Sequence, residues 1–272
     1  MVEPVTRFAP SPTGPLHLGH AYAALVASAR AGKGRFLLRI EDIDTARCRP
    51  EWESAILDDL HWLGIAWKSP VLRQSARQPV YAQALQQLAA LGVTYACSCT
   101  RRDIREVLSA PQEGVVGPDG TVYPGTCRGR QGDGAIRLNM SLAMERLGEV
   151  GFVDTGLRAG EFRFDADVMI GNVGDIVLAR HDIGCSYHLS VVVDDADQGI
   201  TEVTRGADLF DATAIHVVLQ RLLGLPTPTY HHHDLIRDDT GKRLAKRDDA
   251  RALAKYRADG ATANDIRRML GF

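Results

Sequence analysis

Hydrophobic and polar positions in the first quarter of the chain alternate between strand-like and helix-like patterns. Residues 5–9 and 35–40 are short, largely apolar runs of the kind that form buried strands. After His20, apolar positions recur at helical spacing up to Gly32, and a second helical face follows over residues 52–63. Strand, helix, strand, helix is the order in which an open parallel sheet begins. We therefore expect an α/β fold.

The middle of the chain departs from this pattern. Residues 97–130 are rich in Gly, Pro, Arg and Cys and show little apolar periodicity. We interpret them as part of an insertion that extends to about residue 165. The α/β pattern resumes with residues 175–179 and the apolar run 191–193, and a helix is predicted over 212–223.

The tail after Lys246 is polar, and we expect it to be helical. These patterns divide the chain into three parts. The expected parts are a catalytic domain (residues 1–95 and 166–235), an insertion (96–165) and a terminal segment with a basic loop and short helices (236–272).

Composition and charge narrow the class of protein. With 45% hydrophobic residues the chain can form a sizeable core, and its formal net charge of −2 gives no overall positive field to attract nucleic acid. No run approaches the ~18 consecutive apolar residues of a membrane helix, and no secretory signal is visible. Five cysteines, three of them clustered, fit a metal site in a reducing compartment better than a disulfide framework. We expect a cytoplasmic monomer that has no membrane partner.

Residues 14–20 join a predicted strand to a predicted helix, where backbone N–H groups and the helix dipole favour an anion. His17 and His20 can both donate hydrogen bonds to charge that develops on a phosphate, and Gly19 leaves room for a nucleotide. The string His-Leu-Gly-His is common by chance, so by itself it also fits a helix start with incidental histidines.

A second element, residues 241–247, is a glycine-led loop with four cations. A lysine in such a loop suits the β- and γ-phosphates of ATP as a mobile point charge. A solvated basic loop has the same composition. Its pairing with the histidine turn is what favours a nucleotide.

Ordered motifs over nearly the whole chain resemble those of the class I glutamyl-tRNA synthetases. They are residues 7–14 (RFAPSPTG), 17–20 (HLGH), 39–44 (RIEDID), 193–195 (VDD), 199–206 (GITEVTRG) and 243–247 (RLAKR). The resemblance implies a Rossmann-like class I catalytic core with a zinc-binding insertion and a short helical C-terminal segment. The last motif corresponds to the family's lysine loop but has Arg243 and Ala245 where a lysine and a serine are usual. Lys246 is retained, and loss of the hydroxyl at Ala245 is expected to loosen the hold on phosphate.

The resemblance also implies roles for individual residues. It makes His17, His20 and Lys246 catalytic, and it assigns ATP to His17, Gly19, His20 and Lys246. It assigns glutamate to Arg7, Phe8, Ala9, Pro10, Ser11, Glu41, Tyr187 and Arg205. The charges of these residues agree with the assignment. The planar guanidinium groups of Arg7 and Arg205 can bind carboxylates, and the Glu41 carboxylate can bind an α-ammonium.

Each of these residues has a plainer interpretation. Glu41 can cap a turn, Arg205 can pair with Asp208, and Tyr187 can be a half-buried phenol. We expect Asp44 and Asp194 to be structural.

Cys97, Cys99 and Cys127 offer three thiolates to a tetrahedral Zn²⁺, and Tyr123 can add a phenolate oxygen. Three free thiols in a loop are the alternative. The arrangement resembles the zinc-binding insertion of a short branch of the same family, and we expect one structural Zn²⁺. Five arginines lie near these cysteines in the sequence, and they can either contact RNA phosphates or form a solvent-exposed surface. They are Arg101, Arg102, Arg105, Arg128 and Arg130.

Three further features of the sequence are interpreted as structural. Cys48 and Cys185 have no partner in the sequence and are expected to be packing residues. Residues 231–233, three consecutive histidines, follow a strand-like segment and are expected to be structural.

The sequence ends soon after Lys246, whereas full-length glutamyl-tRNA synthetases continue into domains that read the anticodon, so we expect no anticodon-binding domain. This resembles a short branch of the family. For that branch the resemblance implies activation of glutamate by ATP, with Mg²⁺, in the absence of tRNA. The glutamate then passes to the queuosine base at the first anticodon position of tRNA(Asp).

Three rival functions remain open from the sequence. One is a truncated or split synthetase that charges the tRNA 3′ end. Another is a nucleotidyltransferase of the same fold. The third is a non-enzymatic RNA-binding or regulatory descendant of a synthetase.

Overall fold

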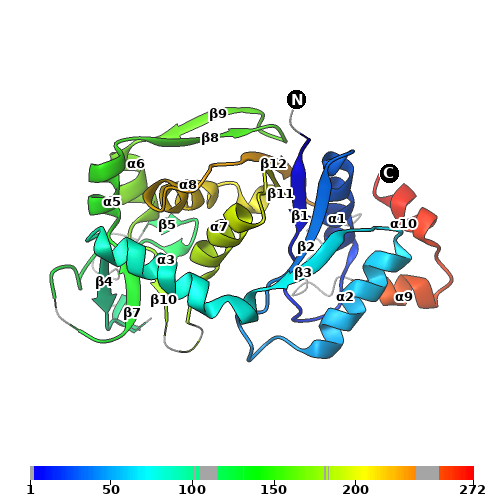
Figure 1. The fold of residues 1–272 in the computed structure, drawn as a ribbon, viewed down its shortest axis with the longest axis horizontal. Helices are drawn as coiled ribbons and strands as arrows, with labels where there is room; N and C mark the ends of the chain where they lie inside the picture. The colour runs from blue at the N-terminus through cyan, green and yellow to red at the C-terminus, as the bar shows by residue number, and fades with distance from the viewer. Residues whose placement is uncertain are drawn as a thin grey trace.

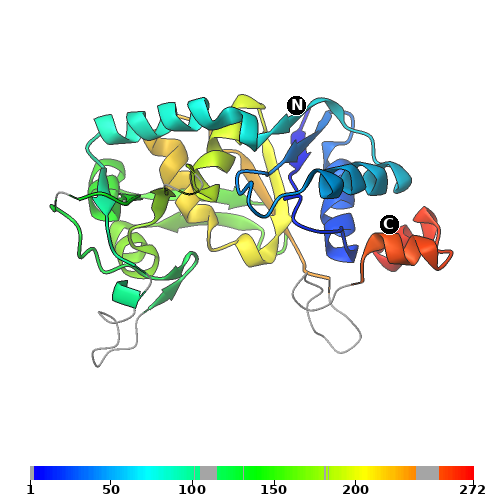
Figure 2. The same cartoon turned by 90° about the horizontal axis from the view of Figure 1, so that it is seen from below.

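The computed structural model describes residues 3–100, 102–104, 115–130, 132–180, 182, 184–236 and 251–272, and every structural statement below concerns these residues. Helices and strands carry the labels of Figure 1. Figures 1 and 2 show an elongated molecule with the N-terminal strands and the C-terminal helices at one end. The cysteine-containing segment lies at the other end.

The first quarter of the chain forms a parallel sheet. Strand β1 (Val5–Phe8) pairs with β2 (Arg35–Ile40), which pairs with β3 (Lys68–Arg73). Helix α1 (Leu18–Ala31) connects the first two strands, and α2 (Pro50–Trp62) connects the second and third. The predicted strands and helices of this region are confirmed. They could be predicted because apolar runs and helical spacing are strongest here.

A second sheet continues the first. Strand β11 (Glu202–Gly206) pairs in parallel with β12 (Thr229–His233), which also pairs in parallel with β8 (Val150–Asp154). Strand β9 (Gly160–Phe164) runs antiparallel to β8. The Val5 N–H donates to Thr201 Oγ1 over 2.9 Å, and the Thr201 N–H donates to the Val5 carbonyl over 3.0 Å. The edge of β11 therefore adjoins the edge of β1, and the strands form the core of a Rossmann-like α/β fold.

Helices α3 (Gln78–Ala90), α7 (Tyr187–Asp197) and α8 (Thr213–Leu222) pack on one side of this core, as seen in Figure 1. The predicted helix over residues 212–223 is confirmed as α8. The apolar run 191–193 lies inside α7, so it is helical.

A smaller antiparallel sheet carries the cysteines. It consists of β4 (Thr94–Cys97), β7 (Ala135–Leu138) and β10 (Val177–Ala179). The hairpin of β5 (Val116–Gly117) and β6 (Gly120–Thr121) lies beside it. The remaining short elements are η1 (Gln74–Arg77), α5 (Met140–Leu147), α6 (Ala166–Val168), η2 (Met169–Val173) and η3 (Ala207–Leu209).

The predicted insertion, residues 96–165, is not a separate layer throughout. Its last two strands, β8 and β9, belong to the sheet of β11 and β12. The bounds of the three parts remain our proposal, because they rest on sequence pattern alone.

The tail is helical, as predicted, with α9 (Leu253–Ala258) and α10 (Ala263–Met269). Leu253 and Ile266 are fully buried in the core that α1 and α2 share, and Figure 2 shows the two terminal helices beside α1. None of the helices in the described ranges has the length and apolarity that crossing a membrane requires.

Candidate active site

The turn between β1 and α1 fixes both histidines of the predicted phosphate site. His17 is the N-cap of α1: its Nδ1 accepts from the Gly19 N–H over 3.1 Å, and its backbone N–H donates to Nδ1 of His20 over 3.2 Å. Because both Nδ1 atoms accept backbone hydrogen bonds, each neutral ring carries its proton on Nε2. The turn therefore presents two imidazole donors at a helix N-terminus, an arrangement that suits a phosphate.

The chain returns to this turn after the basic loop. Ala252 forms an antiparallel bridge with His17. The loop at residues 241–247, with the catalytic candidate Lys246, lies outside the described residues. The bridge nevertheless anchors the chain directly after the loop on the histidine turn.

Strand alternation places two arginines on one face of the sheet. Thr6 faces α1, where its hydroxyl donates to the Ala27 carbonyl over 2.7 Å. Arg7 and Arg39 face α7, and both bind Asp195: Nε of Arg7 lies 2.9 Å and Nη1 of Arg39 lies 2.6 Å from its Oδ1. All three of these side chains are buried. Burial raises the pKa of Asp195, but the two guanidiniums prevail and lower it to about 2.

Glu41 follows the last residue of β2 and lies at the carboxyl end of the sheet. Its carboxylate accepts from Nη2 of Arg39 over 3.1 Å, and its backbone N–H donates to the Pro10 carbonyl over 3.0 Å. Burial raises the pKa of Glu41 against the opposing charges of Arg39 and Arg7. The ends of β1 and β2 thus bring Arg7, residues 8–11 and Glu41 together, where open α/β sheets bind their ligands.

Arg205 lies near the carboxyl end of β11 and is only 6% exposed. Its Nη1 lies 3.0 Å from Nδ1 of His216, its Nε donates to Nε2 of His232 over 3.2 Å, and its Nη2 donates to the Thr213 hydroxyl over 2.7 Å. These three partners position the guanidinium, and the salt bridge to Asp208 that the sequence left open does not. Three of the five N–H groups are used, which leaves two for a ligand.

Tyr187 is the first residue of α7, and it is 39% exposed. Its ring lies edge-on to His188 and His216, with centroids 5.5 Å and 5.8 Å away. Because His216 also contacts Arg205, the tyrosine and the arginine of the predicted glutamate pocket lie in one cluster.

Asp194 is structural, as expected. It is fully buried and accepts hydrogen bonds from Gln74 over 2.8 Å, from Arg77 over 2.7 Å and from the Tyr81 hydroxyl over 2.9 Å. Asp44 is bound by Arg47 at the surface, which also fits a structural role.

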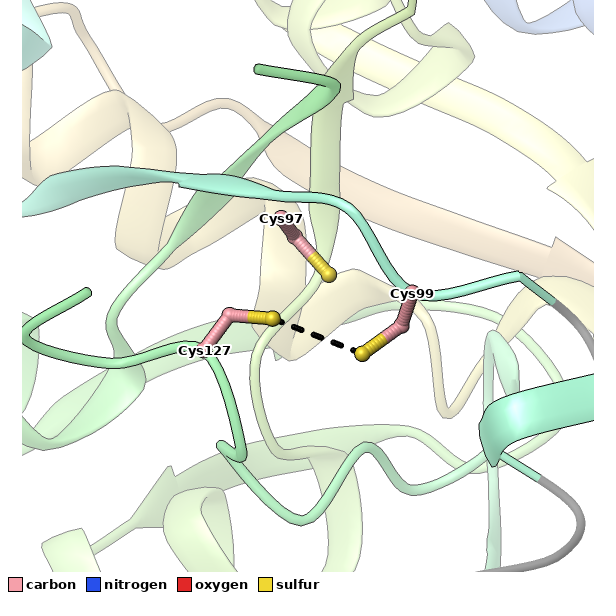
Figure 3. Close-up of side chains that lie close together, drawn as sticks. All are labelled: Cys97, Cys99 and Cys127. Atoms are coloured by element: carbon pink, nitrogen blue, oxygen red, sulfur yellow. Dashed lines mark hydrogen bonds between the residues drawn. The ribbon is translucent and has the colours of Figure 1, made fainter. Parts of the chain in front are cut away.

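The three clustered cysteines meet at one point. Figure 3 shows the thiols of Cys97, Cys99 and Cys127 directed toward one another, and their sulfur atoms all lie within 4.8 Å. Sγ of Cys99 lies 3.4 Å from Sγ of Cys127, and the Tyr123 hydroxyl lies 3.4 Å from Sγ of both Cys97 and Cys99. The four predicted ligands therefore converge, and their donor set and spacing fit one tetrahedral Zn²⁺.

The Cys127 thiol is chemically suited to a cation. Hydrogen bonds, of which that with the Tyr123 hydroxyl has the largest effect, lower the pKa of Cys127 to about 6, which favours the thiolate form. Burial and the neighbouring cysteines raise the pKa of Tyr123. A phenolate at this position consequently needs the charge of a metal ion.

The arginines near the cysteines are not equivalent. Arg128 is engaged with the buried Asp175, through Nε at 2.7 Å and Nη2 at 2.6 Å, so it is structural. Arg102 and Arg130 are exposed. The other two arginines of the predicted cluster, Arg101 and Arg105, lie outside the described residues.

The remaining sequence features are packing residues or parts of strands. Burial raises the pKa of the Cys185 thiol to about 12, which makes it inert. Cys48 is half-buried, with Sγ 4.0 Å from the Glu41 carbonyl. The three histidines form the end of β12, and the fully buried His232 has Nδ1 2.9 Å from Oδ1 of Asp154. A structural role for them is confirmed.

Sequence reasoning missed the residues that hold the site in place. Arg39 and Asp195 appeared only as letters of a motif, and His216, Thr213 and Asp154 were not singled out at all. A charged residue inside the apolar strand 35–40 was the one available signal, because such a residue needs a buried partner.

Comparison with known families places most of the chain in one of them. Residues 3–127 and 152–271 match the profile described as tRNA synthetases class I (E and Q), catalytic domain. A Rhodobacter capsulatus protein named Glutamyl-Q tRNA(Asp) synthetase is 62% identical over 98% of this chain and 99% of its own length. A protein of that name from Albidiferax ferrireducens is 44% identical over 92% of this chain and 86% of its own length.

Solved structures show the same relationship. A glutamate–tRNA synthetase from Elizabethkingia anophelis superposes with a TM-score of 0.81 at 25% identity. The match covers 100% of this chain, which spans 61% of the length of that chain. A methionyl-tRNA synthetase from Mycobacterium tuberculosis shares the fold, with a TM-score of 0.64 at 13% identity.

Proposed function

The chain belongs to the class I tRNA synthetases of the E and Q group, and from this we propose that it activates glutamate with ATP and transfers it to the queuosine base of tRNA(Asp). The family acts on an amino acid, ATP and tRNA. The observation that carries the choice of product is the 62% identity with a relative named for that reaction, over nearly the full length of both proteins.

The charges of the site suit glutamate as the amino acid. Arg205 can bind a carboxylate with its two remaining N–H groups, and Glu41 offers a carboxylate to an ammonium. Arg7 uses its Nε–Nη2 edge on Asp195 and its Nη1 on the Thr204 carbonyl, so its contact with glutamate falls to its remaining N–H groups. Residues 8–11 line the site through the end of β1, and Tyr187 completes it.

The first half-reaction needs positioning and electrostatic stabilisation, because the amino acid itself is the nucleophile. The α-carboxylate of glutamate attacks the α-phosphate of ATP, the P–O bond to the β-phosphate breaks, and pyrophosphate leaves. His17 and His20 donate Nε2–H hydrogen bonds to the charge that grows on the phosphates, and Gly19 lets the nucleotide approach the backbone. Lys246 adds a cation, and Mg²⁺ bound with ATP shares the charge of the leaving group.

In the second half-reaction a hydroxyl of the queuosine ring attacks the carbonyl of glutamyl-adenylate. The C–O bond to the phosphate breaks, AMP leaves, and an ester forms. The exposed Arg102 and Arg130 of the insertion are candidates for contact with RNA phosphates. The cytoplasm is the compartment that we propose, because tRNA is found there and the cluster of Cys97, Cys99 and Cys127 suits a metal site in a reducing compartment.

Mass spectrometry of tRNA(Asp) fragments tests the product. After incubation with glutamate and ATP, the anticodon fragment of queuosine-containing tRNA should gain one glutamyl mass, and tRNA without queuosine should gain none. A gain on the 3′-terminal adenosine would instead identify a synthetase that charges tRNA ends. Absence of any glutamate-dependent ATP–pyrophosphate exchange would exclude both reactions and favour a nucleotidyltransferase or a binding protein.

We also propose that Cys97, Cys99, Tyr123 and Cys127 hold one structural Zn²⁺, which would tie down a segment that has little core of its own. Elemental analysis should find about one zinc per chain, as expected for a single four-ligand site. The Cys127→Ser variant should retain far less, and a chelator should lower the melting temperature of the unmodified protein. Cys48→Ser is the matched control and should keep its zinc. Full zinc content in Cys127→Ser would contradict the assignment.

A further inference from the structure

Arg205 lies at one end of a hydrogen-bonded chain that leads out of the proposed glutamate pocket. Its Nη1 lies 3.0 Å from Nδ1 of His216. Nε2 of His216 lies 3.1 Å from Nδ1 of His188, and Nε2 of His188 lies 3.2 Å from Oδ1 of Asp119. Asp119 belongs to the turn of the β5–β6 hairpin. The chain therefore connects β11, α8 and α7 with the cysteine-containing segment.

The chemistry of the groups fixes the direction of each bond. A guanidinium only donates, so Nδ1 of His216 must accept and its proton must be on Nε2. That proton is donated to Nδ1 of His188, whose own proton is then on Nε2 and is donated to the Asp119 carboxylate. All three hydrogen bonds of this series can form together only when the rings of His216 and His188 are both neutral and in the Nε2–H form. Burial, together with Arg205, holds the pKa of His216 well below its usual range, which agrees.

The chain runs from the interior to the surface. Arg205, His216 and His188 are all buried, whereas the Asp119 side chain is 45% exposed. On the opposite side Nε of Arg205 donates to His232, whose Nδ1–H is donated to Asp154. The guanidinium is thus held between two imidazoles, each oriented directly or indirectly by a carboxylate. The ring of Tyr187 packs against His188 and His216, so the same histidines support both residues of the pocket.

We propose that His216, His188 and Asp119 are positioning residues that orient Arg205 toward the side-chain carboxylate of the amino acid, so that glutamate binding depends on the β5–β6 hairpin. The inference rests on the proposed function, since it takes Arg205 as a ligand of glutamate. None of the three residues needs to contact substrate. Their effect is to keep the two remaining N–H groups of Arg205 in one orientation, which lowers the entropy lost on binding.

Glutamate-dependent ATP–pyrophosphate exchange measures this role in the full-length protein. His216→Leu removes the acceptor, and we expect the KM for glutamate to rise about tenfold or more, because a hydrogen bond to a buried charged group is lost. The KM for ATP should stay within about twofold, since the chain does not reach the histidine turn. His216→Asn places an amide oxygen near the position of Nδ1 and should recover much of the loss.

Variants at the exposed end separate positioning from folding. Asp119→Asn should raise the KM for glutamate about threefold, as expected for one weakened and partly exposed charged hydrogen bond. Asp133→Asn removes another exposed carboxylate of the same segment and should leave it unchanged. An unchanged KM for glutamate in both His216→Leu and Asp119→Asn would overturn the inference. A parallel loss of ATP affinity and melting temperature would show a merely structural role, which also overturns it.

The tautomers can be read without any activity. Nitrogen-15 chemical shifts of the histidine rings should show Nε2–H for His216 and His188 and the opposite form, Nδ1–H, for His232, with assignments from the His216→Asn spectrum. An Nδ1–H form of His216 would refute the chain. If the tautomers are as stated but the unmodified protein shows no glutamate-dependent ATP–pyrophosphate exchange, the proposed function is wrong although the hydrogen-bonded series is present.

Discussion

Replacing Arg205 by leucine should lower kcat/KM for glutamate in ATP–pyrophosphate exchange by about 10²- to 10³-fold, the range for truncating one partner of a buried charge pair. The side-chain carboxylate of glutamate would then enter a buried site without its cation, and the unpaired charge would bear the desolvation cost. Arg205→Lys keeps the charge but loses the planar fork and the contacts with His216 and His232, so we expect an intermediate value.

Two controls make the Arg205 result specific. Arg163 lies on β9 with its side chain 62% exposed, and Arg163→Leu should leave kcat/KM unchanged. Binding of a non-hydrolysable ATP analogue to Arg205→Leu, measured by calorimetry, should match that of the unmodified protein. A kcat/KM for glutamate within about threefold of normal in Arg205→Leu would rule out the proposed contact, since that is well under 1 kcal/mol of binding energy.

Asp195→Asn should lower the free energy of unfolding by about 3 to 5 kcal/mol, the usual effect of removing one partner of a buried ion pair. Arg7 and Arg39 would remain buried, at 6% and 0% exposure, without the carboxylate that they share. Denaturant unfolding followed by circular dichroism measures the change. Asp197→Asn is the matched control on the same helix: its side chain is 50% exposed and paired with Arg77, so we expect a loss under about 1 kcal/mol.

The same carboxylate gives the stability a pH dependence with a defined sign. The pKa of Asp195 is lowered to about 2 from its ordinary value of 3.8. A lowered pKa means that its contribution to stability is fully present above about pH 4 and is lost as the pH falls toward 2. In Asp195→Asn this part of the acid dependence should be missing. If the free energy of unfolding of Asp195→Asn fell as steeply below about pH 4 as that of the unmodified protein, other groups would account for the acid dependence.

The local elements near the histidine turn could be predicted because their patterns are short-range. The apolar run 35–40 became β2 with the predicted bounds, and Gly32 ends α1 as its position suggested. Glu41 directly follows the predicted strand 35–40, and its place beside Pro10 follows from the parallel pairing of β1 with β2. Here local propensity and the fold agree, so periodicity was sufficient.

The pairing of distant strands could not be predicted from the sequence in this way. Strands β8 and β9 lie within residues 96–165, which the composition marked as an insertion, yet β8 pairs with β12. Alternation of apolar residues shows that a segment is a strand, but it does not specify the neighbouring strand.

The partners of the buried charges were equally hidden. Asp195 binds Arg39 across 156 positions of the sequence, and His216 of α8 reaches Arg205 of strand β11. A motif identifies residues that a reaction requires, and it does not show which other side chains neutralise or orient them. That information arises only when the chain folds.

The ion pairs of Asp194 and Asp195 also determine where α7 lies along its own axis. Apolar contacts are non-directional and would tolerate a small slide of the helix over the sheet, whereas carboxylates bound by Arg7, Arg39 and Arg77 would not. Tyr187 is at the other end of the same helix, about 10 Å away at 1.5 Å per residue. The position of Tyr187 beside His216 is therefore also set by ion pairs that lie about two turns further along the helix.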